Sequence, residues 1–354
     1  MKTKNRKAIE NLITYGIVIV AFIACQVLAA NGGMSRSLKG QLVPICVYIV
    51  MAVSLNLVVG VSGELSLGHA GFMSVGAFSG VIASAWFLGA FSMENEIVRL
   101  LLSMLVGGVF AGIAGVLIGI PVLRLRGDYL AIVTLAFGEI IRNLINCIYI
   151  NLEGGALYFG FNNPNLPGKA VLAGPKGTVG VDKIATFTMG FVLILFTLFV
   201  VLNLMNSRSG RAIMATRDSR IAAESVGINA TKYKMMAFVT SSVLAGMAGA
   251  LYGLNYSTVA AGKFKFDTSI LVLVFVVLGG IGNIRGSIVA ATLLTILPEM
   301  LRAFSDYRML VYAVVLILVM LATNSPFITA RLQSVKALFK RKSPSGGRKE
   351  GDAA

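Results

Sequence analysis

The chain has 354 residues, of which 56% are hydrophobic and only 13% are charged. This composition lies outside the usual range of soluble globular domains. Apolar runs of about 20 residues, the length that crosses a bilayer as a helix, recur from end to end. The net charge of +16 does not indicate a nucleic-acid partner, because the basic residues flank the apolar runs and form no single patch with stacking aromatics. The sequence therefore predicts an all-α, polytopic helical membrane protein.

The N-terminal segment 1–10 is basic and leads into the apolar run Leu12–Ala30. This order also fits a secretory signal peptide, since small residues end the run. The run is longer than the apolar core of a signal peptide and suits a membrane span. We therefore favour a retained first span over a cleaved leader.

The transmembrane domain extends over residues 11–328 and contains about ten predicted helices. The eighth and ninth are short and are separated by Gly282–Gly286, so they are either two crossings or one broken, re-entrant pair. The predicted spans are 11–30, 41–61, 68–88, 97–120, 129–150, 185–205, 235–258, 268–282, 284–301 and 308–328.

The distribution of Lys and Arg sets the orientation of these spans. With the N-terminus inside, the inner segments hold 20 basic residues and the outer segments hold 10, while Arg142 lies within a span. This bias predicts a multi-pass protein of the cell (inner) membrane with both termini in the cytoplasm. The tail 329–354 is basic and rich in Ser, Gly and Pro, so we expect it to be disordered. It either anchors the topology or contacts anionic lipid.

The longest outer loop, 151–184, is periplasmic in this topology and rich in Gly, Asn, Pro and aromatic residues. Such a loop is suited to docking an external partner. Its aromatic side chains are equally suited to the membrane–water interface. The sequence alone does not separate these two interpretations.

Small residues recur within the spans at a spacing of four, which lets helix backbones approach closely in a membrane. The pattern Ala-Gly-x-Ala-Gly-x-Leu-x-Gly occurs twice, at 111–119 and 245–253, either as an internal repeat or because both helices have the same packing requirement. The glycine pairs are Gly76 and Gly80, Gly108 and Gly112, Gly115 and Gly119, and Gly249 and Gly253.

The segment Gly60–Gly76 joins the second and third spans and is unusually polar for its depth. It contains Glu64, Ser66, Gly68 and His69. Irregular backbone near a membrane is tolerated where it is buried in protein or lines a cavity. We therefore consider these residues as a pathway wall or hinge, although for His69 itself we favour a structural role in a packed turn.

Glu139 and Arg142 lie three residues apart in the fifth span, on one face of the predicted helix. Ionisable groups inside a span are costly and mark functional sites by default. The alternative is a structural ion pair near the outer end of the helix. Both interpretations are kept.

Residues for enzymatic chemistry are missing from the sequence. His69 is the only histidine and has no neighbours at metal-ligand spacing, and the three cysteines lie within apolar segments, where we expect buried thiols and no disulfide. No phosphate-binding loop and no Ser–His–Asp set occurs. We therefore expect no catalytic site, no metal site and no cofactor in this chain.

The most strongly charged internal stretch is the cytoplasmic loop 205–234, between the sixth and seventh spans. Residues 211–226 predict a short amphipathic helix that Gly227 would end. One interpretation is that this helix docks into the groove of a partner. The other is a solvated basic loop, which would need no apolar face. We favour docking because small apolar residues alternate with the arginines: Ala212, Ala215, Ala222, Ala223 and Val226.

Ala222-Ala223-x-x-x-Gly227 resembles the Glu-Ala-Ala-x-x-x-Gly coupling loop of ABC importer permeases, with Ile221 at the position of the Glu. Other motifs between about residues 42 and 328 resemble the branched-chain amino-acid ABC transporter permeases of bacteria. These motifs are Leu55–Gly60, Ser66–Phe72, Gly127–Thr134, Thr216–Asn229, Tyr233–Phe238, Ala245–Leu251 and Gly279–Asn283. The stretch Arg124–Arg142 is more similar to the LivM-type subunit than to its LivH-type paralogue.

The resemblance implies an ABC importer permease fold and a chain that works with a second, LivH-like permease subunit, two cytoplasmic ATPases that bind ATP and Mg, and an external amino-acid-binding protein. Alternative solutes are urea and short amides, and the alternative class is an ion-coupled secondary transporter. The resemblance places ATPase coupling on Arg217, Asp218, Arg220, Ala222, Ala223, Glu224 and Gly227.

Overall fold

The structure is a computed structural model that describes residues 2–31, 35–125 and 128–301, and single positions between 310 and 321. Residues Met1–Glu299 form one compact unit, and Met300–Ala354 form a second. The predicted tail 329–354 lies outside the described residues, as does most of the predicted tenth span.

In the described part of the chain, seven helices are long and apolar enough to cross a membrane, and they match the first seven predicted spans to within about five residues. Helix α2 passes directly into a π-helix, η1 (Leu57–Ser62), and is almost wholly buried. The number of ten spans stays a prediction. The seven helices, all within the first unit, are α1 (Lys2–Ala30), α2 (Arg36–Asn56), α3 (His69–Phe91), α4 (Glu96–Val122), α5 (Asp128–Cys147), α6 (Phe187–Asn206) and α9 (Ala230–Gly253).

Polar side chains fix where several helices begin. Each cap accepts a hydrogen bond from a backbone N–H of the first turn, which would otherwise have no partner. The caps are Ser35, Asn95, Thr186, Ser207, Ser219 and Asn229.

The first unit also contains shorter elements. Helices α7 (Arg208–Asp218) and α8 (Arg220–Ser225) precede α9, and α10 (Phe266–Gly279) and α11 (Ile284–Met300) follow it. Two 3₁₀ turns lie at Gly174–Lys176 and Ala261–Lys263.

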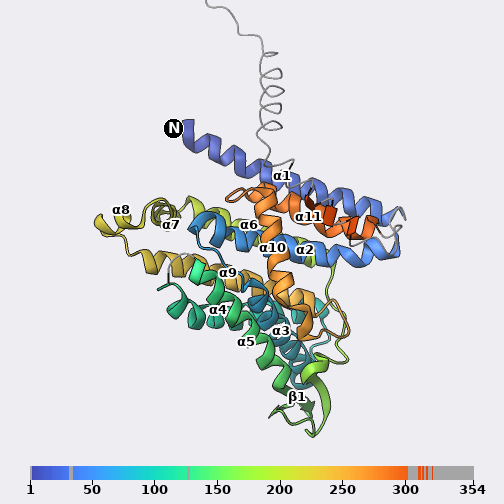
Figure 1. Cartoon of the computed structure of the whole chain (residues 1–354). Helices are drawn as coiled ribbons and strands as arrows, with labels where there is room; N and C mark the ends of the chain where they lie inside the picture. The colour runs from blue at the N-terminus through green and yellow to red at the C-terminus, as the bar shows by residue number, and fades with distance from the viewer. Residues whose placement is uncertain are drawn as a thin grey trace, which may run out of the picture. The chain divides into compact units, whose positions relative to one another are not determined.

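A small antiparallel sheet follows α5 directly and was not predicted from the sequence. Its strands, β1 (Ile148–Glu153), β2 (Ala156–Phe161) and β3 (Lys169–Ala173), pair in the order β2-β1-β3. Gly154 and Gly155, both at positive φ, form the two-residue turn between β1 and β2. The sheet lies at the end of α3 (Figure 1), and the exposed Phe159 and Phe161 on its edge strand are compatible with both interpretations of this loop.

Helices α3, α4 and α9 form the core, in which glycines bring the backbones into direct contact. A Cβ atom at Gly76 would lie 2.0 Å from the carbonyl oxygen of Gly246, and one at Gly249 would lie 2.0 Å from that of Met73. Gly107 and Ala111 of α4 face Gly246 from the other side. The predicted small-residue seams are therefore confirmed, and the two copies of the nine-residue pattern belong to α4 and α9, which pack on each other.

The question of one re-entrant pair or two crossings concerns α10 and α11. Ser287 near the start of α11 accepts a hydrogen bond from Asn56, at the inner end of α2. Near its other end, Glu299 accepts one from Ser37, in the first turn of α2. Helix α11 therefore runs the length of α2, which favours two separate crossings.

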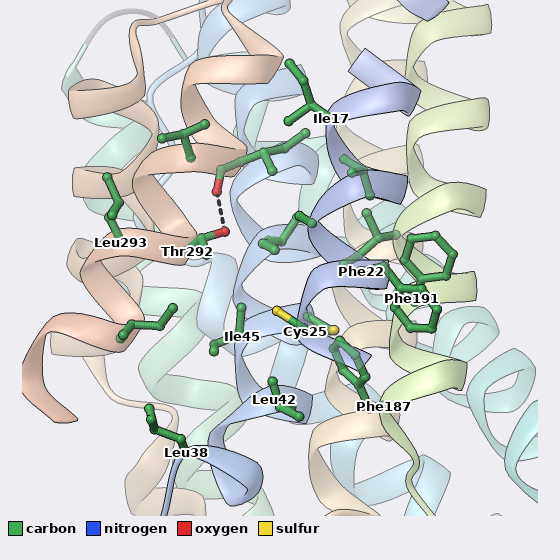
Figure 2. Close-up of a pocket in the computed structure, with 18 residues that line it drawn as sticks. Ile17, Phe22, Cys25, Leu38, Leu42, Ile45, Phe187, Phe191, Thr292 and Leu293 are labelled. Carbon is green, nitrogen blue, oxygen red and sulfur yellow. Dashed lines mark hydrogen bonds between the residues drawn. The ribbon is translucent and has the colours of Figure 1, made fainter. Parts of the chain in front are cut away.

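An apolar cavity of about 290 Å³ lies between α1, α2, α6 and α11. Figure 2 shows Phe22 of α1 beside Phe187 and Phe191 of α6, with ring centroids 5.1 and 4.0 Å away, and Cys25 among the lining side chains. Its lining contains no charged residue, and the hydroxyl of Thr292 already donates to the carbonyl of Ile288, so the cavity is poorly suited to a charged solute.

We predict that Gly249→Val destabilises the folded protein by about 3 kcal/mol or more, because its side chain would collide with the backbone of α3. The midpoint of thermal unfolding in detergent measures the effect. The matched control is Gly16→Ala in α1, where a Cβ atom meets nothing within 4 Å. Equal midpoints for the two variants would contradict the proposed role of the seam.

Candidate functional site: the α7–α8 segment and the inner end of α2

The predicted helix over 211–226 is present as two helices, so this prediction is wrong in part. Ser219 separates α7 from α8 because its extended backbone (φ −156°, ψ 108°) breaks the helical path, and its side chain caps α8. Gly227 adopts φ 85° and ends the segment, as predicted, while the N–H of Ile228 donates to the carbonyl of Ala223. The α7–α8 segment is thus a bent pair of short helices.

The apolar side chains of the segment divide differently from the prediction. Ala223 is buried and packs inwards, whereas Ala222 is exposed. The largest exposed apolar groups are Ile221 and Val226, at 83% and 74% exposure. The prediction that the alanines form a single docking face is therefore wrong. Ala223 packs inside the protein, and the large apolar side chains that face outwards are Ile221 and Val226.

The charged side chains of the segment make two kinds of contact. Arg220 forms an ion pair with Glu224 one turn later, at 2.8 Å, so these two charges neutralise each other locally. Arg217 pairs with the neighbouring Asp218 at 3.1 Å and also reaches out of the segment, donating from Nη1 to the carbonyl oxygen of Gly60 at 2.8 Å. Sequence reasoning missed this second contact, because 157 positions separate the two residues.

A polar cavity of about 410 Å³ lies beside this contact. Glu64, Arg217, Arg220 and Lys234 contribute charged side chains to its wall. Glu64 and Lys234 form an ion pair, and their side chains are only 14% and 12% exposed. The pair ties the loop after η1 to the start of α9, next to the α7–α8 segment.

The inner end of α2 is irregular and polar. In a π-helix each turn is wider than in an α-helix, and such turns are frequent at functional sites. Asn56, 1% exposed, accepts a hydrogen bond from the N–H of Gly282 at 2.8 Å and donates to Ser287 at 2.9 Å. The signal in the sequence was Asn56 itself, a lone amide within an apolar run.

The other predicted residues of the Gly60–Gly76 segment are packed in the protein interior. The ring Nε2 of His69 lies 2.8 Å from Ser54 Oγ, which agrees with the structural role favoured for this histidine. A Cβ atom at Gly68 would lie 2.2 Å from the carbonyl oxygen of Thr134, so this glycine allows α5 to approach. Ser66 is buried, and its hydroxyl has no hydrogen-bond partner within the described protein.

Glu139 and Arg142 form an ion pair of 2.7 Å on α5. Their side chains are 36% and 23% exposed. Gly138 of the same helix packs on Gly71 of α3. The Glu139–Arg142 ion pair therefore lies beside the contact between α3 and α5, and neither residue lines the polar cavity of the α7–α8 segment. Among the described residues, no three His, Cys, Asp or Glu side chains lie close enough together to hold a metal ion.

The long apolar helices define a multi-pass membrane protein, with a polar site where the α7–α8 segment meets η1. Residues 37–320 match the family model described as branched-chain amino acid transport system / permease component. The chain belongs to this family.

Several curated proteins are similar to the chain. It is 33% identical over 310 residues to the high-affinity branched-chain amino acid transport system permease proteins LivM of Salmonella typhimurium and Escherichia coli, a match that covers 78% of this chain and 66% of each relative. The ribose import permease protein RbsC of Escherichia coli is 26% identical over 87% of this chain and 91% of that protein. The chain spans just under two thirds of the LivM proteins. No solved structure is significantly similar to it.

Proposed function

We propose that the chain is the permease subunit of a binding-protein-dependent ABC importer for branched-chain amino acids in the cell inner membrane, with both termini in the cytoplasm. The observation that carries this proposal is the family match over 37–320. The chain is 33% identical to the LivM proteins but only 26% identical to the ribose permease RbsC, and this difference supports amino acids over sugars as the solute. The partners would be a LivH-like permease subunit, two ATPases that bind ATP and Mg, and an external amino-acid-binding protein.

The test is reconstitution in proteoliposomes with these partners. We expect uptake of radiolabelled leucine that requires ATP inside the vesicles and the binding protein outside. Uptake driven by an ion gradient with no ATPase present would contradict an importer powered by partner chains and support a secondary transporter. Competition by urea or short amides, but not by valine or isoleucine, would assign the alternative solutes.

Within the α7–α8 segment, Ile221 and Val226 are proposed as the residues that dock the ATPase. Both are large, apolar and strongly exposed, and Ile221 also lines the polar cavity. Buried apolar anchors surrounded by charged residues are typical of protein interfaces. In this proposal Ile221, which replaces the acid of the general motif, supplies an apolar contact in place of a charge.

We predict that Ile221→Asp reduces ATPase retention at least tenfold, because a carboxylate would be buried at the contact without a partner. Co-purification of the ATPases with the tagged permease measures the effect. The matched control is Ile221→Leu, which keeps the apolar volume and should retain them. Retention of the ATPases by the Asp variant at the wild-type level would refute docking through this residue.

Glu139 and Arg142 are proposed to line the pathway, where the second permease subunit would face α5. Their partial exposure at membrane depth is expensive against lipid and is favourable beside water or a polar partner. The pair has net charge zero, which suits the passage of a zwitterion.

We predict that Glu139→Gln lowers the maximal rate of uptake severalfold, because Arg142 would then leave an unbalanced positive charge in the pathway. The comparison is leucine uptake at equal protein levels, with Glu94→Gln on the loop before α4 as the charge-matched control. Unchanged kinetics would assign the pair a purely structural role.

A further inference from the structure

Arg217 points from the α7–α8 segment towards the membrane-spanning core. Its Nη1 donates to the carbonyl oxygen of Gly60 at 2.8 Å. The stem of the side chain lies over Gly63, where a Cβ atom would be 2.5 Å from Arg217 Cγ. Gly63 also has φ 75°, which L side chains rarely adopt. The end of η1 is therefore shaped to receive this arginine.

Gly60 is held from its other side by the turn between α10 and α11. A Cβ atom at Gly60 would lie 2.4 Å from the backbone nitrogen of Gly282 and 2.0 Å from Asn56 Oδ1. Only glycine at position 60 therefore allows the α10–α11 turn to come this close to η1. One residue of η1 connects the α7–α8 segment with the α10–α11 turn.

Asn56 extends this connection into α11. Its side chain binds the N–H of Gly282 and the hydroxyl of Ser287, both at under 3 Å, and Ser287 is itself fully buried near the start of α11. Hydrogen bonds in such an environment resist separation, because a broken one leaves a buried polar group without a partner. The contacts Arg217–Gly60–Gly282–Asn56–Ser287 form a continuous path between distant segments.

We propose that Arg217 is a positioning residue that transmits movement of the docked α7–α8 segment to η1 and the start of α11. This rests on the proposed function, in which the segment binds an ATPase. ATP can move the spans only through contacts that differ between two states, and in this proposal the Arg217–Gly60 hydrogen bond is such a contact. Arg220 differs from Arg217, because its ion pair with Glu224 stays within α8.

The test uses the complete complex in lipid nanodiscs and proteoliposomes. For Arg217→Gln we expect the ATPases to stay bound to within about twofold of wild type, because docking is proposed on Ile221 and Val226, whereas the Arg217 guanidinium is directed at Gly60. Leucine transported per ATP should fall about tenfold, the scale set by loss of one charge-assisted hydrogen bond. Arg217→Lys, which keeps the charge and a donor, should restore part of the coupling. Lys263→Gln, an equal charge change at an exposed residue outside the α7–α8 segment, should leave it unchanged.

Hydrogen exchange gives a direct readout, since the N–H of Gly282 belongs to the path. In the wild type, ATP should change the exchange of a peptide covering residues 280–288, and Arg217→Gln should abolish that response. Gly60→Ala should uncouple transport in the same way from the other side, with no change of charge.

Three outcomes would count against these ideas in different ways. Normal leucine transport per ATP together with a normal exchange response in Arg217→Gln would overturn the positioning role. Loss of ATPase retention in that variant would also overturn it and would make Arg217 a docking residue. A wild-type complex that retains no ATPase would instead overturn the proposed function itself.

Discussion

The direct backbone contact between α3, α4 and α9 is the constraint on which the rest of the structure depends. Lipid is as apolar as the side chains it would replace, so helices in a membrane associate through close packing and not through the hydrophobic effect. Gly76, Gly246 and Gly249 place no side-chain atom of their own in the contact, so the backbones meet directly. This seam lies in the first half of α3 and near the end of α9, and it holds together the two long helices that follow η1 and the α7–α8 segment in the chain.

The inner end of α2 shows how a membrane protein accommodates irregular backbone. A π-helix and a glycine-rich turn leave polar groups that lipid does not satisfy. Asn56 satisfies one of them, the N–H of Gly282, through its Oδ1, and donates from Nδ2 to Ser287. The polar network and the irregular backbone therefore depend on each other, and both occur where the α7–α8 segment makes contact.

Much of this fold was predictable, and the parts that were not have physical reasons. Apolar run length locates the first seven spans, because a span needs about 20 such residues. Spacing of four located the seams. Strands β1 and β2 were missed because the apolar pattern continues from α5 through Ile148 and Tyr149 without a break. The inward direction of Arg217 was beyond prediction, since local periodicity does not report contacts between distant segments.

The length of α10 has a consequence for the bilayer itself. Its 14 residues make a helix of about 21 Å, well below the roughly 30 Å of a hydrocarbon core. A short helix is accommodated by thinning of the surrounding lipid, at a modest cost for each ångström of mismatch. If α10 crosses the bilayer on its own, the dielectric barrier beside it, next to the polar turn that meets Gly60, would be narrower than the barrier beside the 27-residue α4. A polar solute crossing near α10 would then be solvated over more of its route than one crossing beside α4.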